Sequence, residues 1–229
     1  SSTSVFGFYT LLSRVLGYLR DILIAIFLGT SIYADAFFVA FRLPNTFRRL
    51  FAEGTFNAAF IPSYAEEKLK GEEAGKKFAD EVFNLLLFFL ILLVLVVEIF
   101  TPFLVYLIAP GFYNDPEKFS LATEFTRITF PFLLFVSLSS FLSGILNTNN
   151  KFAAAAAAPI ILNIVLILSM LVSFYFNQNL AKNLSIGVTL AGILQLIILF
   201  IFTRKFYFPS IKLSFKIEES LKRFFKKLL

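Results

Sequence analysis

Long apolar runs alternate with short polar segments along the whole chain. Six of these runs are long enough, at about 20 residues each, to cross about 30 Å of hydrocarbon as a helix. They cover about residues 5–28, 34–60, 82–108, 125–146, 152–176 and 184–203. The pattern predicts an all-α, polytopic membrane protein with a six-span unit over residues 1–206.

Proline and glycine mark where these runs are expected to bend and end. Pro62 is predicted to close the second run, because proline cannot continue a helical ladder without cost. Segment 63–77 is hydrophilic and contains two glycines, which predicts an exposed, partly helical loop. Pro102 predicts a kink in the third run, and Pro131 lies inside the fourth.

Lysine and arginine outside the runs are concentrated in alternate connectors. Segments 63–77, 147–151 and 203–229 together hold thirteen of them, whereas the opposite connectors hold only Lys118 and Lys182. Basic residues near span ends are retained on the cytoplasmic side of a membrane. Both termini of the chain are therefore expected in the cytoplasm.

The cationic segment 207–229 follows the sixth run. From Ser214 onward, Phe and Leu repeat against Lys and Glu, which is typical of an amphipathic helix lying at a membrane interface. The formal net charge of +6 arises largely in this segment and in the connectors. Membrane topology explains that charge, so no nucleic-acid partner is expected.

Composition narrows the possible chemistry. The chain is 58% hydrophobic with a mean hydropathy of +0.81, far more apolar than a soluble domain. It has no cysteine and no histidine, which excludes disulfides, thiol nucleophiles, imidazole bases and His or Cys metal sites. No cofactor is expected, and an intramembrane enzyme is disfavoured because suitably tuned acid, base and nucleophilic groups are scarce. The first residues lack the order of a cleavable signal peptide, so the first run is expected to remain.

Five of the six arginines inside the runs lie in the first two. Arg14 and Arg20 are eight or nine residues from the ends of their run, too deep to reach the interface easily, so they are expected to face a bundle interior or a wet cavity. The second run carries its polar residues at helical spacing: Asp35, Arg42 and Arg49 on one stripe, with Asn45 and Arg48 on an adjacent one.

Two interpretations of these charges stay open. Interior ion pairs, such as Arg49 with Glu53 four residues later, would only fix helix packing. Alternatively, the surplus of cations marks a cavity for an anion, because unpaired buried cations are expensive. Phosphate or pyrophosphate fits such a cavity, since guanidinium presents a planar fork that binds it through two hydrogen bonds. Glu98 and Arg127 lie near run ends and are interpreted as interface residues.

Several ordered motifs cover essentially the whole chain. They are SRVLGYLRD (13–21), ADAFFVAF (34–41), LPN (43–45), RRLFAEG (48–54), AFIP (59–62), APGF (109–112), ITFP (128–131) and GILN (144–147). In this order and spacing they resemble the MurJ (MviN) family of lipid II flippases, within the superfamily of multidrug, oligosaccharidyl-lipid and polysaccharide exporters. Such a set is far more specific than a lone short pattern.

The resemblance implies a transporter that moves lipid II, the undecaprenyl-pyrophosphate-linked peptidoglycan precursor, from the inner to the outer leaflet of the bacterial cytoplasmic membrane. It implies alternating access between two six-span lobes, with this chain resembling the N-terminal lobe and ending where a seventh span should begin. Its expected partners are lipid II, membrane lipids and a second lobe, and its energy source is the membrane potential or an ion gradient. The substrate-binding residues carried over by position are Ser13, Arg14, Arg20, Asp35, Asn45, Arg48 and Glu53.

Two other functions remain open from the sequence. One is export of another polyprenyl-pyrophosphate-linked glycan, or of a drug, by a member of the same superfamily. The other is a non-transporting membrane assembly protein that recruits wall-synthesis partners through its cationic tail. Reversing the charge of Arg14 or Arg20 separates these readings, because an assembly role should survive it.

Overall fold

The computed structural model describes residues 2–52 and 55–211, with side chains described over 7–48 and 56–211. Glu53 and the predicted amphipathic segment over 214–229 lie outside the described residues. Every regular element of the described part is a helix, which confirms the all-α prediction. Its elements are α1 (Ser2–Leu28), α2 (Ile32–Ala52), α3 (Thr55–Leu69), α4 (Glu72–Ile108), the 3-10 helix η1 (Pro110–Asn114), α5 (Pro116–Thr129), α6 (Phe132–Thr148), α7 (Phe152–Tyr175) and α8 (Leu180–Thr203).

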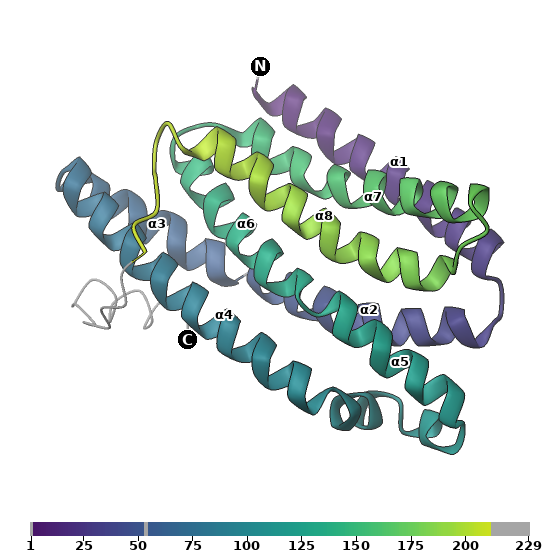
Figure 1. The fold of residues 1–229 in the computed structure, drawn as a ribbon. Coiled ribbons are helices and arrows are strands. Elements are labelled where there is room, and N and C mark those ends of the chain that lie inside the picture. The colour runs from purple at the N-terminus through teal and green to yellow at the C-terminus, as the bar shows by residue number, and fades with distance from the viewer. Residues whose placement is uncertain (1, 53–54, 212–229) are drawn as a thin grey trace.

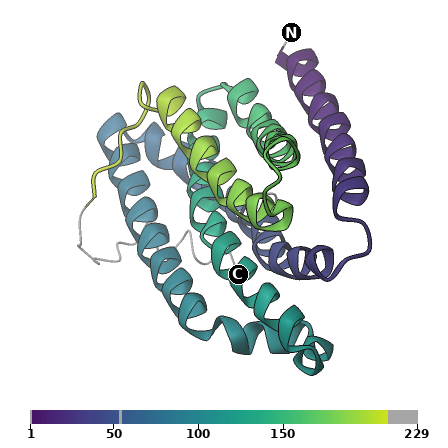
Figure 2. The same cartoon turned by 45° about the vertical axis from the view of Figure 1, so that its right-hand side comes forward.

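The helices form one bundle with α1 and α4 at opposite edges and α6, α7 and α8 between them (Figures 1 and 2). α8 packs along both α6 and α7, and α2 lies along α5. α1 packs almost entirely on α7. It is therefore an edge helix with one main neighbour.

Four described segments are long and apolar enough to cross a membrane: α4, the α5–α6 segment, α7 and α8. α1 and α2 are not among them, although both are long enough. They carry the charges that interrupt the first two apolar runs, such as Arg14 and Arg20 in α1. The count of six spans therefore stays a prediction.

Pro62 does not end a helix, contrary to expectation. α3 continues through it to Leu69, and a short link containing Gly71 leads into α4. The connector over 63–77, expected as an exposed and partly helical loop, is more helical than expected, because α3 reaches Leu69 and α4 begins at Glu72. Gly71 has a φ of +140°, a conformation that L side chains rarely adopt, and this reverses the chain direction.

Aromatic packing explains why α3 continues beyond Pro62. Tyr64, two residues beyond Pro62, is 2% exposed, and its ring stacks on that of Phe60. Phe60 also stacks on Phe78 of α4 and contacts Phe141 of α6, with ring centroids 6.2 and 4.9 Å away. Burial on this scale outweighs the loss of one backbone hydrogen bond.

The kink predicted at Pro102 is confirmed. Phe100 leaves the helical region, with φ −97° and ψ 17°. Proline has no N–H to donate to the carbonyl of Glu98, four residues earlier. The Thr101 hydroxyl donates to the carbonyl oxygen of Val97 at 2.6 Å and lies 3.1 Å from that of Glu98, so its single proton is shared between two carbonyls beside the kink.

The helix that contains the fourth apolar run begins at Pro116, earlier than the expected start near residue 125. α5 and α6 are separated only by Phe130 and Pro131, and both keep helical backbone angles. The two helices therefore continue as one segment, Pro116–Thr148, with the proline inside it as expected.

The connectors rich in basic residues lie at one end of the bundle. Lys68, beside the α3–α4 link, donates to Asn149 Oδ1 in the α6–α7 link at 2.8 Å. The other connectors lie at the far end, where Lys118 begins α5 and Lys182 pairs with Glu124 at 2.8 Å. The two groups separated by charge in the sequence are also separated in space.

Residues 204–211, here called the strap, run back from α8 onto α4 (Figure 1). Tyr207 donates its hydroxyl to Asp80 Oδ1 at 2.7 Å, and the N–H of Ser210 donates to the same oxygen at 3.0 Å. Burial, and then the Asp80 carboxylate, raise the pKa of Tyr207 well above its usual value. The phenol therefore stays protonated and keeps donating.

Candidate functional site

A cavity of about 610 Å³ lies among α1, α6, α7 and α8, with α2 and α3 contributing to one side. Its volume is typical of a site for a small ligand or a head group. Arg14, Arg20 and Arg48 line it. Three of the residues predicted at separate places in the sequence thus reach one space.

One face of α1 supplies the charged wall. Arg14, Gly17 and Arg20 recur every three residues, and Ser13 lies four residues before Gly17, so they share one side of the helix. All four line the cavity. Between them, Val15 points away and is 57% exposed. α1 is therefore polar toward the cavity and apolar on its far side.

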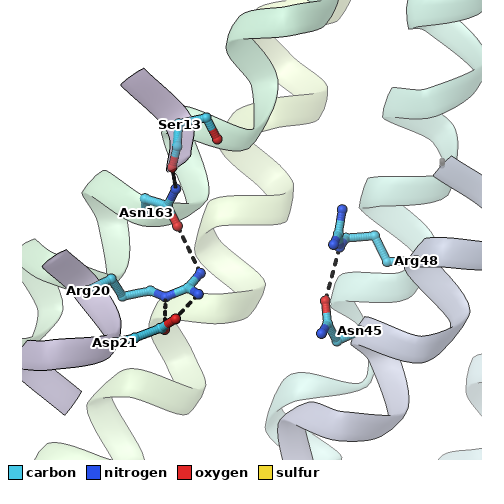
Figure 3. A network of polar contacts seen from close by, with 6 residues as sticks. All are labelled: Ser13, Arg20, Asp21, Asn45, Arg48 and Asn163. Atoms are coloured by element: carbon cyan, nitrogen blue, oxygen red, sulfur yellow. Dashed lines mark hydrogen bonds and ion pairs between the residues drawn. The ribbon is translucent and has the colours of Figure 1, made fainter. Parts of the chain in front are cut away.

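Arg20 is held on two sides (Figure 3). Its Nε and Nη2 donate to Asp21 Oδ1 at 2.9 and 2.8 Å, and its Nη1 donates to Asn163 Oδ1 at 2.8 Å. Its side chain is 18% exposed, so the guanidinium is substantially shielded from solvent. Charge-assisted bonds of this kind fix both the position and the plane of the group.

Asn163 of α7 is the residue that connects this wall to the bundle. It is 5% exposed, and its Nδ2 donates to the backbone carbonyl of Ser13 at 2.9 Å while its Oδ1 accepts from Arg20. One carboxamide therefore holds two points of α1 about two turns apart. The sequence analysis missed Asn163, and its only signal there is a lone amide in a long apolar run.

Arg48 approaches from the other side. Its Nε donates to Asn45 Oδ1 at 3.1 Å, so Asn45 supports Arg48 from one turn earlier on α2. Figure 3 shows Arg20 and Arg48 extending toward each other from α1 and α2. Arg14 is exposed, and no hydrogen bond or ion pair joins it to another residue in the described ranges.

Asp35 lies elsewhere. It sits in the first turn of α2 and pairs with Lys118 of α5, whose Nζ lies 4.5 Å from the centroid of the Phe112 ring. Asp35 does not line the cavity, because α2 places it more than three turns from Arg48. Its predicted part in substrate binding is not supported by this arrangement.

Uncharged groups complete the lining. Asn57 of α3, Gln195 of α8 and four polar residues of α6 face the cavity, and so do small residues of α7. The α6 residues are Ser139, Ser140, Ser143 and Asn147, and those of α7 include Ala155, Ala156 and Ala158. The alanine run over residues 153–158 therefore borders the cavity.

Charge and geometry indicate what this cavity can bind. Three guanidinium groups present planar, always-charged donors, and one of them is already held in place by neighbours. Such a set binds phosphate oxygens through paired, charge-assisted hydrogen bonds. No group of three or more carboxylates within the described ranges is placed to hold a metal ion.

The fold is similar to that of solved helical transporters. The structure matches an outward-facing multidrug resistance MATE family transporter of the MOP superfamily, with a TM-score of 0.72, 13% identity and coverage of 99% of this chain and 50% of that one. At this identity the match shows the fold alone. The fold is that of half a MOP-type helical transporter.

The family follows from closer matches. The family description "Lipid II flippase MurJ" matches residues 24–229. A probable lipid II flippase MurJ from Rhizobium tropici is 46% identical over 203 residues, which cover 86% of this chain and 38% of that protein. The solved structure titled "Lipid II flippase MurJ, inward closed conformation" matches with a TM-score of 0.79 and 31% identity, over 97% of this chain and 46% of the other. The chain belongs to the lipid II flippase MurJ family, and it spans less than half the length of these relatives.

Proposed function

We propose that this chain forms one lobe of a transporter that moves lipid II from the inner to the outer leaflet of the bacterial cytoplasmic membrane, for cell wall synthesis. The convergence of Arg14, Arg20 and Arg48 on one cavity carries this proposal. Pyrophosphate, the charged group of such a lipid, is the ligand that three guanidinium groups recognise best. The proposed cycle breaks no covalent bond, so the chain acts as a transporter and not as an enzyme.

The charge of the head group suggests an energy source. A membrane potential, negative inside, is worth about 2.3 kcal/mol per elementary charge per 100 mV. An anionic head group that moves outward travels toward the positive side, so the potential favours its export. An ion gradient is the alternative source, and dissipating each gradient separately in liposomes distinguishes the two.

Alternating access needs two halves that move around a central site. We propose that this lobe of six spans works against a second lobe, in the same longer protein or on another subunit. Native mass spectrometry of residues 1–229 in nanodiscs should show this lobe associated with a second lobe or as a homodimer. The dimer should bind the lipid without flipping it. A monomer that flips lipid II alone would contradict the two-lobe mechanism.

The proposed orientation, with both termini cytoplasmic, has its own test. Single cysteines replacing Lys70 or Lys151 should be shielded from a membrane-impermeant thiol reagent in intact cells. Cysteines replacing Asn114 or Lys182 should react. The sequence has no native cysteine, so the background is low. The reverse labelling pattern would overturn the orientation.

The decisive experiment is a flipping assay in liposomes with labelled lipid II and the full-length protein. Arg14→Ala, Arg20→Ala and Arg48→Ala should each abolish transport, and lysine should rescue only partly because it lacks the planar fork. Arg42→Ala is the matched control, since Arg42 is an exposed arginine of α2 that does not line the cavity. Normal transport by all three cavity variants would refute the proposed anion site.

A further inference from the structure

One wall of the cavity carries no charge. Ser139, Ser143 and Asn147 recur every four residues and so share one face of α6, and Gln195 of α8 joins them in the lining. These four residues are called the neutral wall below. The arginines reach the cavity from α1 and α2 instead, so a ligand there meets two chemically different sides.

Most hydroxyl groups elsewhere in the described apolar helices are already occupied, although Ser63 Oγ and Ser137 Oγ have no partner among the described residues. Ser169, Ser173 and Ser185 each donate to the carbonyl four residues earlier, at 2.7 to 2.9 Å. Ser139 differs, because its Oγ is buried and has no hydrogen-bond partner among the described residues. No hydrogen bond joins Ser143 to another residue of the described part either.

The two carboxamides of the neutral wall also make no side-chain hydrogen bond to a described residue. Gln195 is only 3% exposed, and within the described ranges its side chain makes no hydrogen bond. The side chain of Asn147 makes none to a described residue. Ser139 and Gln195 are buried, whereas Ser143 and Asn147 are half-buried. Buried polar groups without partners destabilise a helical interior, so the place of Ser139 and Gln195 along a cavity points to a ligand that pairs with them.

The chemistry of the neutral wall indicates what that ligand carries. Hydroxyl and carboxamide groups supply both donors and acceptors without charge, which matches the hydroxyl and acetamido groups of a sugar. A site built to bond such groups discriminates strongly against an analogue that lacks them. We propose that the neutral wall binds the sugar next to the pyrophosphate of the transported lipid, while the arginines hold the pyrophosphate. This assignment rests on the proposed function, because it places the same lipid in the same cavity.

The position of α6 favours this role. At Gly144, on the same helix, an added Cβ would lie 2.8 Å from Phe60 Cδ1 and 2.9 Å from Asn57 Oδ1. α6 is thus tightly packed against α3, and Asn57 Nδ2 also donates to Ser140 Oγ at 2.9 Å. A wall fixed in this way loses little conformational entropy when it binds a ligand.

Binding of the sugar can be distinguished from binding of the pyrophosphate by comparing two lipids. Undecaprenyl pyrophosphate and the same lipid bearing an N-acetylated disaccharide would each be titrated onto the full-length protein in nanodiscs and followed by native mass spectrometry. The wild-type protein should prefer the sugar-bearing lipid by at least about tenfold. Ser139→Ala combined with Ser143→Ala, and separately Gln195→Leu, should lower that preference about tenfold and leave the affinity for the bare lipid unchanged.

Controls keep the outcomes distinct. Ser185→Ala removes a buried hydroxyl from α8 that already bonds its own helix, so the preference should not change. Thermal melting of each variant checks folding, and removal of unpaired polar groups should leave it unchanged or raise it. Arg14→Ala should weaken both lipids equally.

Each result decides one claim. Equal binding of the two lipids by the wild-type protein, or an unchanged preference in the neutral-wall variants, would overturn the sugar assignment while the arginine results still support the pyrophosphate site. Failure of the wild-type protein to bind either lipid would overturn the proposed function and the sugar assignment together.

Discussion

The two walls of the cavity are held in the bundle by different means. α6, which carries the uncharged side, belongs to a tightly packed core in which Phe60 and Phe141 are fully buried. α1, which carries Arg14 and Arg20, touches essentially one helix and is fastened to it through the amide of Asn163. Elements with few buried contacts open at lower free energy than core elements. The charged wall is therefore the more movable of the two.

The largest expected loss of stability comes from a substitution in the aromatic core that supports α6. Phe60→Ala should lower the free energy of unfolding by about 3–5 kcal/mol, because it leaves a cavity among stacked rings. Phe8→Ala removes the same side chain from α1, where the ring is 62% exposed, and should change stability by less than about 0.5 kcal/mol. Thermal or denaturant unfolding in detergent measures both. Comparable losses from the two variants would contradict the difference between the walls.

Adding one methyl group to a glycine of each wall compares how tightly α6 and α1 are packed. Gly144→Ala places a Cβ within 2.8 Å of Phe60 and should destabilise the protein by about 1–3 kcal/mol through overpacking. Gly17→Ala in α1 places its Cβ 3.6 Å from Asn163 Nδ2, an ordinary contact, and should be tolerated. The pair is read in the same unfolding assay. If Gly17→Ala proved the more damaging, the α1–α7 contact would be the tighter one.

Replacing the amide tests whether Asn163 positions Arg20. Asn163→Leu keeps the volume but removes both hydrogen bonds, and it should weaken binding of the pyrophosphate lipid about tenfold, in line with the loss of a bond to a charged group. Asn163→Gln keeps an uncharged amide with both an acceptor and a donor, so it should retain more of the affinity than Asn163→Leu. A purely structural role would instead make the two variants equally weak. Native mass spectrometry measures the affinities, and a melting curve measures the fold.

The smallest effect concerns the strap. Tyr207→Phe removes the hydrogen bond to Asp80 and should cost about 1 kcal/mol of stability. The raised pKa of Tyr207 means that the folded state holds the phenol proton more tightly than the unfolded state. The contribution of Tyr207 to stability should thus be constant below about pH 10, the ordinary value for tyrosine, and fall above it. The variant should lack that component of the fall in melting temperature, and an identical pH profile would refute the bond.

The sequence predicted those site residues that are charged within an otherwise apolar run. Arg14 and Arg20 interrupt an apolar helix at helical spacing, so their common face could be read directly. Asn163 could not be assigned, because it lies 143 residues from Arg20 and an uncharged amide in an apolar run says nothing of its partner. Only the fold brings the two together.

The same limit explains the error at Pro62. A local rule about proline predicted the end of a helix, but burial of Tyr64 against Phe60 depends on α4, which follows later in the chain. At Pro102 the rule succeeded, and the shared hydroxyl proton of Thr101 does not remove the kink. Local rules hold where no distant packing opposes them.

The strap also has a mechanical meaning. Asp80 accepts from two groups of the strap, and Asn84, one turn further along α4, donates to the Ser210 carbonyl oxygen at 2.8 Å. A tension applied to the chain at Ser210 is therefore borne first by α4, through three hydrogen bonds, and not by the end of α8. The kink at Phe100 lies beyond this anchored part of α4, so a tension on the strap reaches α4 before its bend.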